Sequence, residues 1–438
     1  MNNLRLLAGL FATALLSGGA RAHGPQAVFT PEDLFLSAEA NSVQLRSSFA
    51  AQAEADREIS VARTEMLPEI DARLSVSYIG DGFTTGRGFG DYQRAPIPHL
   101  GTGLSLNISQ PVYTGGAVTS AIEMAELRST AARYATDFRR DNLRFRLMGS
   151  YLDIYKCHNL KAVIESNLES AREILREMHA RYEQGTALFN DITRYELLVS
   201  NLELRLTKID NTISILNADI VTTAGLPEAT VVLPDTTILS RVLPHGAEQW
   251  WQQEAALNSP SLSLARSKVD ISRKAEDLVR ADRRPKIGLQ AGWTLDGPIL
   301  VEIPPVNRNL SYWFVGVGIS YNISSIYKND KTMARSRAAT ARAIADLEAA
   351  REDLSLAVHS DHIKYLEACE ELKTRLKGVE LAERNYRTVA TRYAADMALI
   401  TDMLDAANAR LEAGRQLVNA RIDIIYYYYK LLFTSGKI

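Results

Sequence analysis

The sequence predicts a mainly α-helical chain that also contains two pairs of β-strands. Long stretches repeat apolar residues with 3,4 spacing, four shorter stretches alternate apolar and polar residues, and the order of these features occurs twice. The 438 residues leave room for a repeated architecture, and 46% hydrophobic with 23% charged residues indicates a large core rather than disorder. The formal net charge of −2 argues against a general nucleic-acid binder.

The N-terminal residues have the features of a secretory signal. Arg5 supplies the positive charge, residues 6–16 form a short apolar run, and residues 20–22 read Ala-Arg-Ala, a typical cleavage site. We therefore expect residues 1–22 to be a signal peptide, with a buried N-terminal helix as the alternative. No later apolar run reaches the roughly 18 residues of a transmembrane helix. An exported chain of this kind is periplasmic, secreted or an outer-membrane β-barrel.

Self-comparison indicates that one unit is written twice. Arg181-Tyr182 and Ala187-Leu188 recur 211 residues later as Arg392-Tyr393 and Ala398-Leu399. Each unit reads helix, strand, strand, helix, helix. We expect a first repeat over 23–225, a linker that forms an equatorial region over 226–246, and a second repeat over 247–438.

The 3,4 spacing predicts coiled-coil helices. It continues unbroken from Ile192 to Ile220, and in the second copy, from Met403 to Leu431, only Arg410 interrupts it. A sustained period of 3.5 residues keeps one narrow stripe facing a partner helix. Two helices should be long, each about 100 Å, and these cover residues 117–183 and 328–394. The shorter helices are expected at 37–66, 190–224, 247–283 and 400–432.

The alternating stretches predict four strands, at residues 69–80, 101–113, 285–296 and 311–323. Each is long enough for a tilted strand to cross a bilayer. Aromatic residues near their ends suit a membrane interface; these are Tyr78, Tyr113, Trp293 and Tyr312. A half-buried soluble sheet is the alternative. Four strands cannot close a barrel, so a membrane-spanning chain must oligomerise, and three chains would give twelve strands.

Other candidate sites have simpler interpretations. Cys157 and Cys369 could pair in an oxidising compartment, but they occupy equivalent places on two long helices and nothing brings them together, so we expect two buried small apolar residues. His359 and His362 share a helical face without a third ligand, so we expect no metal site. Among residues 426–429, we expect Tyr427 to lie in the coiled-coil stripe and the other tyrosines to pack or face water, rather than to form a stacking platform for a ligand. No nucleotide-binding glycine motif or hydrolase motif is present, so we expect neither an enzyme nor a cofactor.

Over nearly all of the mature chain, the order of motifs resembles the TolC family of outer-membrane efflux proteins. The duplication is one part of this resemblance, and four short motifs are the other. These motifs are Leu67-Pro68 before the first strand, Gln110-Pro111-Val112-Tyr113 before a Gly-Gly helix start, the Arg-Tyr-Glu-Gln-Gly-Thr turn at 181–186, and Thr401-Asp402-Met403-Leu404-Asp405.

The resemblance implies a homotrimer in which a 12-strand transmembrane β-barrel is continued by a 12-helix coiled-coil α-barrel. Such a protein would be a passive exit duct of a tripartite efflux pump or type I secretion system, set in outer-membrane lipid and extending into the periplasm. Its helical tips would dock onto a periplasmic adaptor (membrane fusion) protein and an inner-membrane transporter. A periplasmic coiled-coil scaffold or adaptor is the alternative function.

The resemblance also implies a pore constriction. Asp402 and Asp405 match the family's aspartate rings, in which carboxylates around a narrow mouth attract cations and repel anions. A solvated pair near a helix N-terminus is the alternative, because the helix dipole favours carboxylates there.

Further tip residues are expected to hold the gate and the adaptor. Tyr393 and Asp191 match members of the links that hold closed states in the family. Asp396 stands where the family has a turn glycine, and Ala398 stands where it has an arginine. Gly185 is expected to adopt a left-handed turn conformation. The adaptor contact is expected at Gly185, Thr186, Ala187, Leu188, Met397, Ala398 and Leu399.

Overall fold

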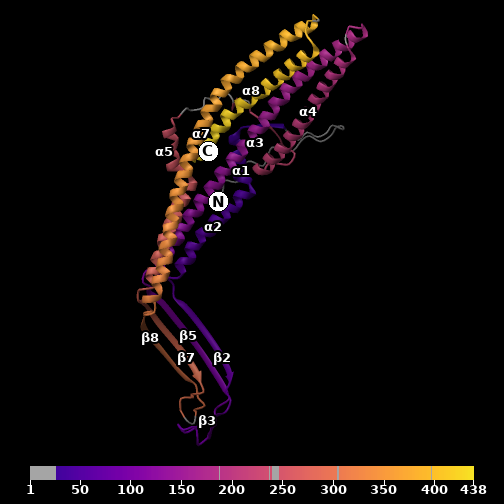
Figure 1. The fold of residues 1–438 in the computed structure, drawn as a ribbon. Coiled ribbons are helices and arrows are strands. Elements are labelled where there is room, and N and C mark those ends of the chain that lie inside the picture. The colour runs from indigo at the N-terminus through magenta and orange to yellow at the C-terminus, as the bar shows by residue number, and fades with distance from the viewer. Residues whose placement is uncertain (1–25, 187, 236, 239–245, 303–304, 396) are drawn as a thin grey trace, which may run out of the picture. The chain divides into compact units, whose positions relative to one another are not determined.

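The computed structural model divides into two compact units, each of which draws on both predicted repeats (Figure 1). It describes residues 26–186, 188–235, 237–238, 246–302, 305–395 and 397–438. The predicted signal peptide, Ala187, Asp396 and part of the predicted linker lie outside the described residues. We call Met1–Ser42, Leu147–Val242 and Leu372–Ile422 the hairpin unit, and Val43–Arg146, Leu243–Glu371 and Asp423–Ile438 the sheet unit. Among the described helices, none carries an apolar stretch long enough to cross a membrane.

The sheet unit contains an antiparallel sheet in the order β2-β5-β7-β8 (Figure 1). Its strands fall close to the four ranges expected from the alternation, and they are β2 (Glu69–Tyr78), β5 (Leu100–Tyr113), β7 (Lys286–Gly297) and β8 (Leu310–Ser320). A short hairpin of β3 (Gly82–Thr84) and β4 (Gln93–Ala95) lies between β2 and β5 in the chain. No sequence pattern predicted this hairpin.

The register of the sheet gathers the apolar residues on one face. Ile70 lies opposite Ile108, Ile108 opposite Ala291, and Ala291 opposite Val315. Residues directly opposite one another point to the same face. The neighbouring pair on β2 and β5, Asp71 with Asn107, is polar and lies on the other face, as does the pair of Arg73 with Ser105. The sheet is therefore amphipathic.

This apolar face is exposed in the isolated chain, most of all on the two outer strands. Leu74 on β2 is 73% exposed and Ile319 on β8 is 71% exposed. A half-buried soluble sheet would cover such residues. Contiguous exposed apolar patches mark surfaces that meet lipid or protein.

The helices of the sheet unit are α2 (Val43–Thr64), α5 (Glu248–Asn258), α6 (Pro260–Ala281), the first part of α3 (Ala117–Glu183), most of α7 (Ser325–Ala394) and the end of α8 (Ile400–Thr434). Three of them, α5, α7 and α8, share an apolar core. Trp251, Val358 and Leu431 are buried, with Tyr427 and Tyr428 packed against them. Tyr427 therefore packs against a helical core, as expected.

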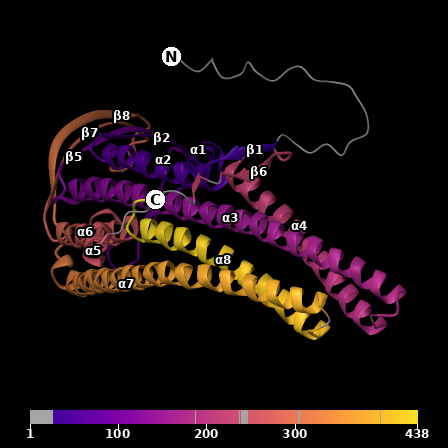
Figure 2. The same cartoon turned by 90° about the horizontal axis from the view of Figure 1, so that it is seen from above.

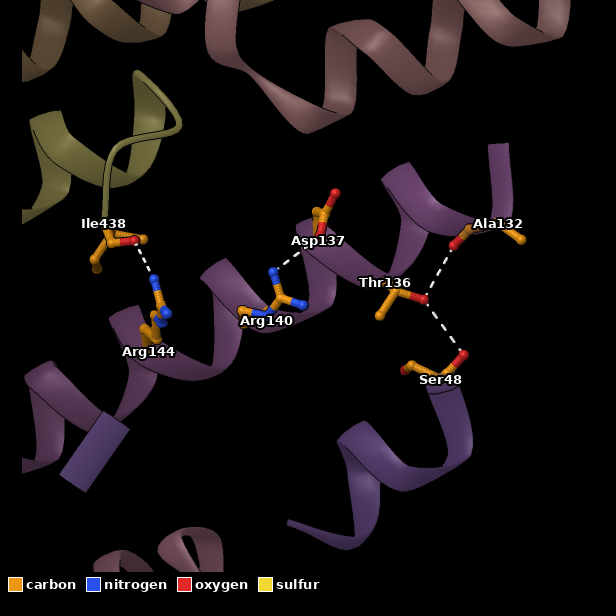
Figure 3. A network of polar contacts seen from close by, with 7 residues as sticks. All are labelled: Ser48, Ala132, Thr136, Asp137, Arg140, Arg144 and Ile438. Atoms are coloured by element: carbon orange, nitrogen blue, oxygen red, sulfur yellow. Dashed lines mark hydrogen bonds and ion pairs between the residues drawn. The ribbon is translucent and has the colours of Figure 1, made fainter. Parts of the chain in front are cut away.

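Polar contacts join the first part of α3 to α2 and to the segment that follows α8 (Figure 3). The Thr136 hydroxyl on α3 lies 3.0 Å from the Ala132 carbonyl and 3.3 Å from the Ser48 carbonyl on α2. Further along α3, the Arg144 guanidinium donates to the Ile438 carbonyl at 2.6 Å. Because buried polar groups are costly when unpaired, these bonds stabilise the packing of α3.

The hairpin unit is built from two helical hairpins, α3 with α4 (Phe189–Ala224) and α7 with α8 (Figure 2). Their stripes meet in a core that includes Met178, Ile192, Tyr195, Leu202 and Met403, each at most 2% exposed. These positions belong to the predicted 3,4 pattern. The unit also contains α1 (Pro31–Asn41) and a parallel pair of short strands, β1 (Gln26–Phe29) and β6 (Val231–Pro234).

Arg410, which interrupts the 3,4 pattern, is accommodated by its neighbours on α7. Its Nε lies 2.7 Å from a Glu383 carboxylate oxygen, and its guanidinium lies 4.7 Å from the centre of the Tyr386 ring. A cation placed among apolar residues is tolerated when it is paired in this way.

Two helices expected to be continuous are each broken in two, so the predictions for 37–66 and 247–283 were wrong in this respect. The breaks fall at Ser42 and Ser259, whose ψ angles of 126° and 119° are extended. Pro260 follows the second break and disfavours helical geometry in the residue before it. Ser42 has no such neighbour, but it occupies the equivalent place in the first repeat.

The duplication is also visible at two helix ends. Gly225 after α4 and Gly436 after α8 have φ angles of +65° and +71°. A Cβ at Gly225 would lie 2.5 Å from the Asn41 Cβ, and one at Gly436 would lie 2.5 Å from the Asn258 carbonyl oxygen. Only glycine satisfies both the left-handed conformation and the close approach.

Neither Cys157 nor Cys369 forms a disulfide, and both are half-buried. Burial raises the pKa of the Cys157 thiol, which makes it a poor nucleophile. The two cysteines therefore do not form a disulfide, as expected, although they are less buried than expected.

Candidate functional site

The turn of the first hairpin has the geometry expected from the sequence. Gly185 has a φ of +74°, so its left-handed conformation is confirmed. The Thr186 backbone N–H and hydroxyl both donate to the Arg181 carbonyl, at 2.9 and 3.0 Å. A Cβ at Gly185 would meet no atom within 4 Å. The glycine is therefore required by backbone conformation rather than by crowding.

The turn of the second hairpin is stabilised by Asp402. Its carboxylate accepts a hydrogen bond from the Leu399 backbone N–H at 3.0 Å. Leu399 precedes the first residue of α8, so Asp402 satisfies one of the N–H groups left free at a helix start. Asp402 was expected to line the pore, and in the structure it also caps the start of α8.

Asp402 and Asp405 lie on the exposed side of α8, three residues apart. Met403 and Ala406, on the other side of the helix, are 1% and 2% exposed. The two carboxylates therefore point away from the core of the hairpin unit, and in one chain they form a short acidic strip at the start of α8.

Arg181 joins the two hairpins, and the sequence analysis did not identify it. Its Nη2 donates to the Ala394 carbonyl of α7 at 2.9 Å, and its guanidinium lies 5.8 Å from the centre of the Tyr393 ring. The same side chain pairs with Glu177 at 3.1 Å and is only 20% exposed. Ala394 is the last residue of α7, where carbonyls lack helical partners and a cation is favoured.

Of the expected gate residues, Tyr393 is therefore placed at a contact between the hairpins. Asp191 lies in the first turn of α4. Within the residues that the structure describes, no side-chain contact joins it to Tyr393. Two tyrosines of the neighbouring core, Tyr195 and Tyr386, have pKa values raised by burial, so they remain neutral.

Large apolar side chains are exposed at both turns. Leu188 and Phe189 of the first hairpin are 69% and 64% exposed, and Met397 and Leu399 of the second are each 70% exposed. Phe189 adds to the tip residues expected from the sequence. Apolar residues gathered at exposed turns are typical of surfaces that meet another protein.

Comparison with known proteins identifies the family. Residues 34–197 and 251–426 match the family model described as outer membrane efflux protein. Over 431 residues the chain is 21% identical to the outer membrane efflux protein BepC of Brucella suis, covering 98% of this chain and 90% of that protein.

Solved structures share the fold. The outer-membrane channel OprN has a TM-score of 0.77 at 17% identity, covering 93% of this chain and 90% of its own. The outer membrane protein VceC of Vibrio cholerae has a TM-score of 0.75 at 14% identity, covering 93% of this chain and 96% of its own. With most of its length matched by the family model, the chain belongs to the family of outer membrane efflux proteins.

Proposed function

We propose that this chain is a passive exit duct of a tripartite efflux pump or type I secretion system, assembled as a homotrimer in the outer membrane. The amphipathic sheet carries the proposal. Its apolar face is exposed along β2 and β8, and its polar face suits a water-filled interior. A soluble scaffold or adaptor protein would have to leave the same apolar face in water.

The order of the strands supports closure by several copies. Three antiparallel pairings separate β2 from β8, so the two outer strands run in opposite directions. The β8 edge of one copy can therefore pair in antiparallel fashion with the β2 edge of the next. Open edges in lipid leave backbone groups unsatisfied, and a closed barrel removes them. Three copies would give the twelve strands expected from the sequence.

The two hairpin turns are the proposed docking surface for the adaptor protein and, through it, the inner-membrane transporter. Their exposed apolar residues supply contact area, and their short turns tolerate approach by a partner. We assign this role to Gly185, Thr186, Ala187, Leu188, Met397, Ala398 and Leu399, and add Phe189.

The start of α8 is the proposed constriction. In a trimer, Asp402 and Asp405 would form two rings of carboxylates, which favour cations. The contact of Arg181 with Tyr393 and Ala394 supports a closed arrangement, because the second hairpin cannot separate from the first without breaking it. Arg181 thus provides a cation beside Tyr393 in a chain that lacks the family's arginine at Ala398.

Membrane fractionation distinguishes an outer-membrane duct from a soluble periplasmic scaffold or adaptor. The full-length protein should sediment with outer membranes and require detergent for release. Recovery of the folded protein in the periplasmic extract, without detergent, would favour the scaffold.

A further inference from the structure

The polar face of the sheet carries two aromatic side chains on one strand. On β2, β5 and β7, this face has mainly glycine, serine and other polar residues. On β8, the same face carries Tyr312, which lies opposite Thr294, and Phe314, which lies opposite Gly292. Two large rings therefore lie next to each other on a face that is otherwise made of small and polar side chains.

The Phe314 ring covers the backbone of Gly292. A Cβ at Gly292 would lie 2.5 Å from the Phe314 Cε1 and 2.8 Å from its Cζ, so the ring occupies the space that a side chain would fill. Gly292 is buried, whereas Phe314 is 44% exposed. An aromatic ring over a glycine stabilises a sheet by itself. The exposed part of this ring is nevertheless a flat apolar surface that a second ring can stack on.

Tyr312 and Asp296 lie beside this ring, toward the loop that joins β7 to β8. Tyr312 is two residues from Phe314 on the same face, a separation of about 7 Å along the strand, and it is 51% exposed. Asp296 lies opposite Leu310, so it is the diagonal neighbour of Tyr312 on the adjacent strand. Asp296 is exposed, and no cationic side chain of the described residues forms an ion pair with it. Two exposed rings and one available carboxylate are therefore close together.

The charge of the polar face also favours a cation. Its carboxylates are Glu69, Asp71 and Asp296, and its cations are Arg73 and Lys286. Lys286 is at the other end of β7 from Asp296, about 33 Å away, and cannot neutralise it. In the proposed barrel, β2 of a neighbouring copy lies beside β8 and brings two carboxylates and one cation with it. Assembly therefore keeps the surroundings of the two rings negative.

We propose that Tyr312, Phe314 and Asp296 form a binding site for planar aromatic cations on the pore-facing wall of the duct. The two rings stack on the planar part of the ligand and attract its charge through their π faces. The carboxylate attracts the same charge. The site rests on the proposed function only in that the polar face lines the pore, and it adds a class of solute that the wall retains during transit.

The binding test uses the purified full-length protein in a non-ionic detergent. Fluorescence anisotropy gives the Kd of N-methylacridinium, a planar aromatic cation. Competition gives the Kd of acridine, which is neutral at mildly alkaline pH, and of tetraethylammonium, a cation without a ring. The variant is Tyr312→Leu with Phe314→Leu, because leucine still covers Gly292 but has no π face. Its matched control is Phe83→Leu with Tyr92→Leu, two exposed aromatic residues that contact each other at the β3–β4 hairpin.

The wild type and the control should bind N-methylacridinium more tightly than either acridine or tetraethylammonium. The ring variant should raise the Kd of N-methylacridinium at least about fivefold, because two cation–π contacts are lost. Asp296→Asn should raise it about threefold and leave the Kd of acridine unchanged, because only the charged probe is attracted by the carboxylate.

A Kd of the ring variant equal to that of the control would overturn the site. So would tetraethylammonium that binds as tightly as N-methylacridinium. If the ring variant does not assemble, Asp296→Asn decides: an unchanged Kd for N-methylacridinium, or an equal loss for acridine, would overturn the site.

Planar bilayers distinguish failure of the site from failure of the proposed duct. The channel carries Asp402→Asn and Asp405→Asn, so that the proposed constriction does not bind the cation. N-methylacridinium added on the side of the β7–β8 loop should block this channel, and the ring variant should weaken the block at least about fivefold. Normal conductance without block would overturn the site and leave the duct. Binding in detergent by a protein that forms no channel would contradict the duct and leave the rings as a binding surface.

Discussion

The contacts of Arg181 predict that this residue holds the two hairpins together. One guanidinium donates to the last carbonyl of α7 and lies over the Tyr393 ring. A hydrogen bond from a charged donor contributes about 1.5–3 kcal/mol. Arg181→Gln should therefore favour separation of the hairpins and raise the single-channel conductance in planar bilayers. Arg176→Gln, an exposed position on the same helix, is the control. If both variants conduct like the wild type, Arg181 does not restrain the gate.

Asp402 and Asp405 can be tested without disturbing the helix start. Asparagine removes the charge but keeps a side-chain oxygen that can accept from the Leu399 N–H. Trivalent cations added on the periplasmic side should block the wild-type channel, because they bridge the carboxylates. The variant Asp402→Asn with Asp405→Asn should assemble normally, but it should no longer be blocked by these cations and should lose its cation selectivity. Asp396→Ala, alone and in combination, tests for a further ring. Full block in the triple variant would place the constriction elsewhere.

At the scale of elements, the two faces of the sheet predict opposite responses to arginine. Leu74 and Leu289 lie on the apolar face, and arginine there should cost about 2–4 kcal/mol near the bilayer midplane and reduce outer-membrane assembly. Ser75→Arg and Gln290→Arg, one residue along the same strands, lie on the polar face and should assemble. Quantitative blotting of outer membranes measures this difference. If arginine at all four positions allowed equal outer-membrane assembly, the result would contradict the barrel.

Replacing glycines by alanine should change the stability of the protein to different extents, depending on the backbone conformation and the space at each position. Gly225→Ala combines a left-handed conformation, which costs about 1–2 kcal/mol, with a 2.5 Å approach to Asn41. Gly185→Ala has the conformational cost alone, because its surroundings are open. Gly149→Ala, in the interior of α3, should stabilise by about 0.5–1 kcal/mol. In thermal unfolding, the melting temperature should be lowest for Gly225→Ala, intermediate for Gly185→Ala and highest for Gly149→Ala. A Gly225→Ala variant as stable as the wild type would contradict the close approach.

Local patterns predicted the long elements because each pattern reports one buried face. The 3,4 spacing indicated α3 and α4, and the alternation indicated the four long strands. The pairing of β1 with β6 had no such signal, because it joins four-residue strands far apart in the chain. The break at Ser42 was missed because no proline marks it.

The candidate site shows the same limit. The left-handed Gly185 could be predicted because a Gly at a helix end is a local signal. The capping role of Asp402 could also have been predicted, because a carboxylate in the first turn of a helix commonly accepts a hydrogen bond from the backbone N–H of the residue just before the helix. Arg181 was not, because its partners lie on α7, and only the tertiary structure brings them together.

The proposed trimer requires that the sheet of one chain forms a third of a closed barrel. β2 and β8 run in opposite directions and leave their outer edges unpaired within the described sheet. In the proposed barrel, the exposed apolar face contacts lipid and the open edges pair with neighbouring copies. Cysteine pairs that join β2 to β8 between copies test both the pairing and the number of chains.

The measurement places one cysteine on β2, at Ser75 or Ser77, and one on β8, at Gly316 or Gly318, with Cys157 and Cys369 replaced by alanine. Oxidised outer membranes, analysed by denaturing electrophoresis without reductant, should give a ladder that ends at three chains for at least one combination. Single-cysteine variants should give at most a dimer. A ladder that ends at two chains, or continues beyond three, or no crosslink in any combination, would contradict the trimeric barrel.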